Sequence, residues 1–222
     1  MLFRSDYIKQ RCHGDFRWWY EYSGGKLTDW GAHHVDIGQW GIGMEDSGPT
    51  SIEVTKGVLP VDFKQGWPTA DDRYNTTTAF LVRATFANDV VMDIRHDTEN
   101  GVTFQGTNGR IFVTRDRIDL IGGAVDALSK DPVPESLLKE LRKGKRVDNH
   151  MANFFECARD RDVPVADVWS HHRALTTCHL ANIAIRLGRH QLHWDPAKEE
   201  IVGDSEANAW QSRPQRARYE IV

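Results

Sequence analysis

Residues 75–95, NTTTAFLVRATFANDVVMDIR, predict two β-strands around a tight turn. Its first part, Asn75–Phe86, is rich in β-branched and aromatic residues. Asn88 and Asp89 then supply turn residues, and Val90–Arg95 follows as the returning strand. Strands joined by so short a turn run antiparallel. The segment therefore predicts the centre of an antiparallel β-sheet.

Neighbouring segments on both sides extend this sheet. Ser51–Lys56 has a period of two and predicts a strand, which a loop rich in Pro, Gly and Asp (59–72) separates from the central pair. Three further strands separated by turn residues follow the pair, at 101–105, 110–114 and 117–121. We therefore expect a mainly antiparallel sheet over about residues 51–121.

One helix is expected before the sheet and two after it. The first covers 28–42, with Thr28 or Asp29 as its N-cap and Gly41 and Gly43 at its end. A charged connection, 126–147, follows the sheet. The second and third helices then cover about 148–160 and 167–187.

The two later helices differ in their patterns. The second has an amphipathic face made by residues three and four apart: Met151, Phe154, Phe155 and Ala158. The third has Asp167 as a cap, Gly188 at its end and apolar residues on both sides, which indicates burial. No alternation of strands and helices occurs. The order of elements predicts one α+β domain over residues 1–222, an open-faced mainly antiparallel sheet with flanking α-helices.

Composition excludes several classes of function. The formal charge of -4 gives no basic surface for nucleic acid or anionic lipid. No apolar stretch approaches the ~18 residues of a membrane span. The first residues, MLFRSDYIKQRCHG, do not resemble a signal peptide, and the three cysteines form no metal or disulfide pattern. We therefore expect a cytoplasmic protein without nucleic-acid or membrane partners.

The sharpest local feature is the run 24–36, GGKLTDWGAHHVD. On one helix Asp29 and His33 share a face, and Asp36 extends the same stripe. An aspartate beside a histidine holds the ring and raises its pKa, as suits a proton carrier near neutral pH. Two alternatives stay open: an N-cap with a packed histidine, or a metal held by these three residues.

Other clusters also have two interpretations. The aromatic stretch Phe16–Tyr22 fits either a surface for stacking sugar rings or a core patch. Arg17 fits a ligand clamp or an ordinary ion pair. His172, in a His-His-Arg run that opens a helix, fits a pocket wall or a solvated turn. The glycine-rich run Gly41–Gly48 lacks dinucleotide-fingerprint spacing and follows a helix, so no nicotinamide site is recognisable.

Long motifs resemble the C-terminal domain of bacterial Gfo/Idh/MocA oxidoreductases. The first is the run 12–34, CHGDFRWWYEYSGGKLTDWGAHH. The later ones resemble the closing helices and tail of that family: HMANFF at 150–155, ANIA at 181–184, LGR at 187–189 and WDP at 194–196. The resemblance covers nearly the whole chain.

The resemblance implies functions for particular residues. The Asp-x-x-x-His pair of the family falls on Asp29 and His33, which makes His33 the acid/base and Asp29 the residue that positions substrate or His33. The substrate, a sugar or cyclitol, is then expected to contact nearby polar and aromatic residues: Arg17, Trp18, Tyr20, Lys26, His34 and His172. In the family NAD or NADP binds to a Rossmann domain that precedes Ser5, and the exposed sheet face often forms oligomers.

One departure limits the expected activity. The catalytic lysine of the family lies in a Glu-Lys-Pro motif, which this chain lacks. We expect the chain alone to bind no cofactor and to be inactive in redox chemistry. Two other hypotheses are kept: a cofactor-independent carbohydrate-binding or oligomerisation module, and a non-redox lyase or hydrolase that acts on keto-sugars through Asp29 and His33. A homo-oligomer through the sheet face is also expected.

Overall fold

The structure is a computed structural model that describes residues 7–123, 130, 133–141 and 149–213 of the 222. The chain forms two compact units. The first consists of the residues up to Thr98 and from His172 onward, and the second is Glu99–His171. Both contain helices and antiparallel strands, which confirms the predicted α+β class.

The first unit is built on a five-stranded sheet with the order β10-β9-β1-β4-β5, and every pair is antiparallel. Its strands, in chain order, are β1 (Ser51–Val58), β4 (Ala79–Thr85), β5 (Val91–Arg95), β9 (Gln191–Asp195) and β10 (Glu200–Val202). The predicted central pair is confirmed, because Thr85 pairs with Val91 and Leu81 with Arg95. Asp89 has a φ of 61° in the connecting turn, a conformation that aspartate tolerates better than most residues.

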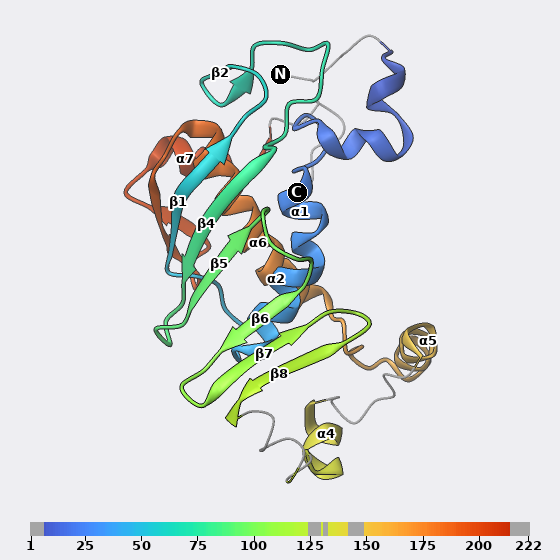
Figure 1. The fold of residues 1–222 in the computed structure, drawn as a ribbon. Helices are drawn as coiled ribbons and strands as arrows, with labels where there is room; N and C mark the ends of the chain where they lie inside the picture. The colour runs from blue at the N-terminus through green and yellow to red at the C-terminus, as the bar shows by residue number, and fades with distance from the viewer. Residues whose placement is uncertain (1–6, 124–129, 131–132, 142–148, 214–222) are drawn as a thin grey trace. The chain divides into compact units, whose positions relative to one another are not determined.

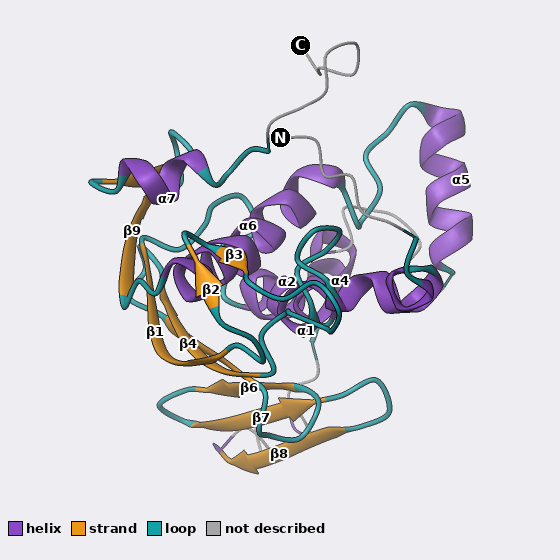
Figure 2. Cartoon of the chain, turned by 90° about the horizontal axis from the view of Figure 1, so that it is seen from above, coloured by secondary structure: helices purple, strands orange, loops and turns teal. Residues whose placement is uncertain are grey.

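Helices cover one face of this sheet (Figures 1 and 2). They are α1 (Lys26–Asp29), α2 (Gly31–Gly41) and α6 (Val168–Leu187), whose first residues belong to the second unit. Ile52 and Val82 of the sheet form the core with Leu180 and Ala184 of α6, all 0–1% exposed. The predicted burial of the last helix is confirmed.

The other face of the sheet is polar. Arg83 of β4 pairs with Asp93 of β5 at 2.9 Å, and their side chains are 51% and 43% exposed. An open-faced sheet is therefore confirmed, and self-association through this face stays a prediction.

The start of the first helix differs from the expected one. Neither Thr28 nor Asp29 is the N-cap, because the helix begins earlier, at Lys26, after Gly25. Gly25 has a φ of 68°, and a Cβ there would lie 2.5 Å from the Thr76 side chain. A glycine therefore sets this turn. The expected helix over 28–42 is also divided at Trp30 into α1 and α2.

The first unit contains several elements that the sequence pattern did not predict. Strands β9 and β10 complete the sheet, and β9 pairs with β1 through Ile52 and Leu192. A two-residue hairpin, β2 (Phe63–Lys64) with β3 (Trp67–Pro68), lies in the expected loop 59–72. A short helix, α7 (Ser205–Ala209), follows β10 and has Asp204 as its N-cap.

The second unit contains a separate three-stranded sheet. The expected hairpin strands form β6 (Val102–Gln105), β7 (Gly109–Val113) and β8 (Ile118–Gly122), in that order. The strands therefore exist as predicted, but residues 51–121 contribute to two main sheets. The connection 126–147 lies partly outside the described residues and contains α4 (Glu135–Leu141).

Helix α5 (His150–Asp160) of the same unit is capped by the Asn149 side chain, which accepts a hydrogen bond from Ala152 N at 2.9 Å. The apolar residues of its expected face are largely exposed: Met151 by 56%, Phe154 by 53% and Phe155 by 62%. The helix buries Asn153 and Cys157 instead. The reason is local, since Asn153 Oδ1 accepts a hydrogen bond from Val165 N at 3.2 Å.

Candidate functional site

The aromatic stretch before α1 is partly core and partly surface. It follows two 3₁₀ helices, Lys9–Arg11 and His13–Trp18. Trp19 and Tyr20 are 0% and 1% exposed, whereas Phe16 and Tyr22 are 45% and 44% exposed. Trp19 and Tyr20 therefore belong to the core, and Phe16 and Tyr22 are exposed where a sugar ring could stack.

Tyr20 is a structural residue of the core. Its hydroxyl donates to Asn182 Oδ1 at 2.8 Å and accepts from Thr77 N at 3.2 Å. Burial raises the pKa of Tyr20 to about 12, so the phenol stays protonated at neutral pH. Asn182 in turn donates to Gly24 O at 2.9 Å, which joins α6 to the glycine turn before α1.

Arg17, in the aromatic stretch, forms an ion pair with Asp29 at the end of α1. Its Nη1 lies 3.1 Å from Asp29 Oδ2, and its Nε donates to Gly14 O at 2.8 Å. The guanidinium carbon lies 5.7 Å from the centre of the Trp18 ring. The Arg17 and Asp29 side chains are 39% and 34% exposed, and an exposed pair of this kind contributes about 0–1 kcal/mol to stability. Variants of either residue should therefore fold.

Trp30, at the junction of α1 and α2, contacts both histidines of the motif. The His34 ring stacks on it with centroids 5.6 Å apart and planes 13° apart. The His33 ring meets its edge at 6.3 Å. His33 is exposed, and its ring accepts or donates no hydrogen bond to the part of the chain that is described. These are two contact groups, which meet where Asp29 is followed by Trp30 in the chain. We call them together the Arg17–His34 surface; its members are Arg17, Trp18, Asp29, Trp30, His33 and His34.

Asp29 has a different partner from the one that the helical spacing suggested. Its carboxylate binds Arg17, and no hydrogen bond between Asp29 and His33 is present. The division of the helix at Trp30 accounts for this, because the His33 N–H bonds to Trp30 O. Among the described residues no three His, Cys, Asp or Glu side chains form a group that suits a metal ion, so the metal interpretation with Asp36 gains no support.

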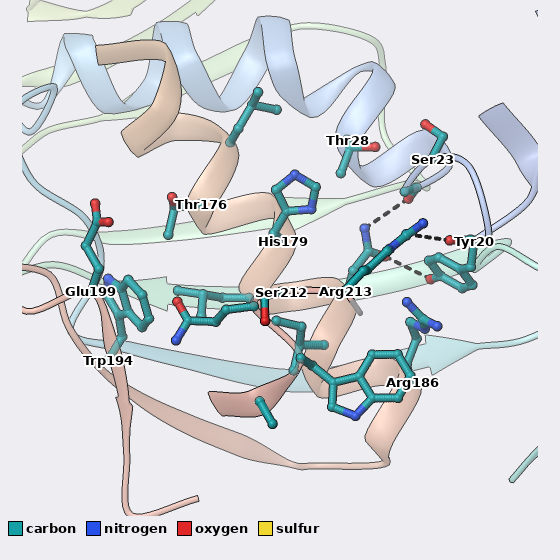
Figure 3. Close-up of a pocket in the computed structure, with 18 of the residues that line it drawn as sticks. Tyr20, Ser23, Thr28, Thr176, His179, Arg186, Trp194, Glu199, Ser212 and Arg213 are labelled. Carbon is teal, nitrogen blue, oxygen red and sulfur yellow. Dashed lines mark hydrogen bonds between the residues drawn. The ribbon is translucent and has the colours of Figure 1, made fainter. Parts of the chain in front are cut away.

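A second feature of the first unit is a cavity of about 950 Å³, shown in Figure 3. We call it the α6 cavity because one stripe of α6 forms its wall: His172, Leu175, Thr176, His179, Ile183 and Arg186. The facing walls come from the Tyr20–Thr28 segment, from Trp67 and from the segment Trp210–Arg213 after α7. Tyr20 and His172 therefore line this cavity, and are not part of the Arg17–His34 surface.

Carboxylates at the rim of the cavity are neutralised. Glu199 accepts hydrogen bonds from His172 at 2.8 Å and from Arg173. The bond from His172 lowers the pKa of Glu199, and the charges of both residues add to the effect. Glu206 pairs with Arg189 at 2.6 Å.

The chain can now be compared with known proteins. A family model for the C-terminal alpha/beta domain of an oxidoreductase family, Gfo/Idh/MocA, matches residues 3–221. The chain belongs to this family. None of the curated proteins compared with the chain matches it. No helix in the described part of this Gfo/Idh/MocA domain is long and apolar enough to span a membrane.

The residues expected for a Gfo/Idh/MocA site therefore separate into two places. Arg17, Trp18 and Asp29 form one contact group, and His33 and His34 contact Trp30, the residue after Asp29. Lys26 is the exposed first residue of α1. Tyr20 and His172 line the α6 cavity. The histidines His171, His172 and His179 cluster in the sequence, but neither His179 nor Arg186 was expected as a site residue. Their signal was present, because polar residues at 172, 176, 179 and 186 recur at helical spacing on a helix that is otherwise mostly apolar.

Proposed function

We propose that this chain is the substrate-binding and acid/base domain of an NAD(P)-dependent oxidoreductase that acts on a sugar or cyclitol, and that it is inactive in redox chemistry alone. The observation that supports the proposal most directly is the ion pair between Arg17 and Asp29. The residue after Asp29 is Trp30, whose ring contacts the imidazole rings of His33 and His34. Membership of the Gfo/Idh/MocA oxidoreductases supports the reaction class.

The surface offers the groups that a hydroxyl-rich ligand needs. Arg17 uses Nε for Gly14 and Nη1 for Asp29, which leaves its Nη2 donors for a ligand hydroxyl. The planar rings of Trp18 and Trp30 suit the C–H face of a sugar or cyclitol. His33, an exposed imidazole, accepts the proton of the reacting hydroxyl. Asp29 positions Arg17 and adds negative charge beside the proton acceptor.

The described residues do not fit a nicotinamide dinucleotide. Such a cofactor binds at a glycine-rich turn between a strand and a helix N-terminus. Here the run from Gly41 follows α2 and leads into β1, and all paired strands of the described sheets are antiparallel. We therefore propose that a separate domain supplies the cofactor, and derive no step through it.

Neutral ring-shaped polyols are the ligands that test this function. We expect isothermal titration calorimetry with myo-inositol and D-glucose to detect saturable binding of at least one of them. Arg17→Met should weaken that binding at least tenfold, since a hydrogen bond from a charged donor contributes roughly 1.5–3 kcal/mol. Asp29→Asn should weaken it similarly, because the guanidinium loses its anchor.

The matched control is Arg73→Met. Arg73 forms an exposed pair with its neighbour Asp72, 2.8 Å away, outside the Arg17–His34 surface, and should leave the affinity unchanged. Polyol binding that is unaffected by Arg17→Met, Asp29→Asn and His33→Ala would contradict the proposed site.

A second candidate is a cofactor-independent carbohydrate-binding module. The α6 cavity favours it, because its walls combine tryptophan rings with polar side chains and its volume of about 950 Å³ exceeds that of one sugar ring. Sugar binding that survives His33→Ala and Arg17→Met, with contacts in the cavity, would support this second function.

A further inference from the structure

Arg186 of α6 is a buried cation without a carboxylate partner among the described residues. The residue is 9% exposed and lines the α6 cavity. Its Nε donates to Gly66 O at 3.1 Å, and this is its single hydrogen bond to the described chain. Its Nη2 is inaccessible and has no hydrogen-bond partner. A buried charge in this state costs stability unless something else binds it.

Aromatic rings surround the guanidinium but leave its charge in place. The guanidinium carbon lies 4.6 Å from the Tyr20 ring centre, 5.4 Å from that of Trp67 and 4.3 Å from that of Trp210. Trp67 and Trp210 also contact each other, with centroids 5.0 Å apart. Cation–π contacts stabilise a cation and fix its orientation, yet they add no negative charge.

The nearby charges leave the cavity positive. Arg213 also lines it and donates to the Tyr20 carbonyl at 2.7 Å (Figure 3). It also donates to the Glu21 carbonyl at 2.6 Å. The Glu21 carboxylate lies 3.8 Å from Arg11 Nη2 and accepts a hydrogen bond from Asn75, and its charge also acts to raise the pKa of Arg186. The rim carboxylates Glu199 and Glu206 are held by His172, Arg173 and Arg189.

The protonation states of Arg186 and His179, which line the cavity, suit a bound anion. Burial lowers the pKa of Arg186 to about 10, with Tyr20 and Arg213 acting in opposite directions, so the side chain stays charged at neutral pH. Desolvation lowers the pKa of His179, and the positive charges of Arg213 and His172 lower it further. A neutral imidazole can both donate and accept hydrogen bonds to a ligand.

We infer that the α6 cavity is a binding site for a small organic oxyanion, a polyhydroxylated molecule that carries a carboxylate or phosphate, and that Arg186 is its charge partner. Arg186 supplies the charge, His179 and Thr176 supply hydrogen-bonding groups, and Trp210 supplies an apolar wall. This site is separate from the Arg17–His34 surface and does not depend on the proposed redox function.

Two sugars that differ at a single carbon test the inference. D-Glucuronate has a carboxylate at C6 where D-glucose has a hydroxymethyl group. In calorimetric titrations of the whole chain at low ionic strength, glucuronate should bind at least tenfold more tightly than glucose. Arg186→Met should remove that preference, whereas Arg186→Lys, which keeps the charge, should retain part of it. Glucose 6-phosphate in a parallel titration distinguishes a phosphate ligand from a carboxylate ligand.

The same calorimetric titrations include a control variant and can give two results that would overturn the inference. Arg83→Met removes a paired arginine from the open face of the sheet, and should leave the preference intact. Equal affinities for glucose, glucuronate and glucose 6-phosphate in the unmodified chain would overturn the inference, with no variant required. A preference that persists in a folded Arg186→Met variant, checked by circular dichroism, would also overturn it. Neither result depends on cofactor, turnover, Asp29 or His33.

Discussion

Asn182→Ala should lower the free energy of unfolding by about 3 kcal/mol, because it leaves the buried Tyr20 O–H donor and the Gly24 carbonyl without their hydrogen-bond partner. Asn182 is 4% exposed. Its Oδ1 accepts from the Tyr20 hydroxyl at 2.8 Å and its Nδ2 donates to Gly24 O at 2.9 Å. Each orphaned buried group costs roughly 1–3 kcal/mol. Urea denaturation followed by circular dichroism measures the loss.

Two further variants show whether the loss comes from this network. Asn88→Ala removes an exposed asparagine that donates to Ile42 O at 3.1 Å and accepts from Val90 N at 3.3 Å. Because both bonds are exposed to water, this variant should cost less than about 1 kcal/mol. Tyr20→Phe removes the hydroxyl that Asn182 accepts from. The double variant should be less destabilised than the sum of the two single variants. Additive effects, or a loss below about 1 kcal/mol for Asn182→Ala, would show that the network contributes little.

Gly31→Ala should destabilise the fold by about 2 kcal/mol through overpacking between α2 and α6. A Cβ at Gly31 would lie 2.5 Å from Cys178 Sγ. Cys178 is 0% exposed and belongs to the core, so neither helix can easily move away. Burial also raises the pKa of the Cys178 thiol to about 12, which keeps it protonated through the measurement. Chemical denaturation of the two chains gives the difference.

Removing the sulfur provides the rescue. In a Cys178→Ala background the added methyl group should cost less than half as much, because the atom it meets is gone. Gly14→Ala is the matched control, since its Cβ would meet the end of the Arg17 side chain at 3.5 Å, an ordinary contact. An equal cost of Gly31→Ala in both backgrounds would mean that the close approach to Cys178 is not its cause.

Local patterns predicted most of the fold. The strand pair around Asp89 and the helix that Asp167 caps follow from period and turn chemistry alone, and both are confirmed. Strand β9 was missed, because it is five residues long and its partner β1 lies about 140 residues earlier in the chain. The start of α1 was misplaced because Gly25 is constrained by Thr76, a contact that no local pattern records.

The candidate site was predictable to a smaller extent. Spacing brought Asp29 and His33 together on an ideal helix, but the division at Trp30 and the ion pair with Arg17 depend on tertiary structure. The stripe that contains His179 and Arg186 was visible in α6. Its meaning depends on Trp67 and Trp210, which only the fold places around that helix.

Imidazole NMR tests directly whether polyols bind at the Arg17–His34 surface. The chain is labelled at its histidine rings and titrated with myo-inositol or D-glucose, whichever binds in calorimetry. We expect the His33 and His34 ring signals to shift in a saturable way with one dissociation constant, and Asp29→Asn to weaken the binding at least tenfold. Saturation with shifts confined to His172 and His179, which line the α6 cavity, would contradict it.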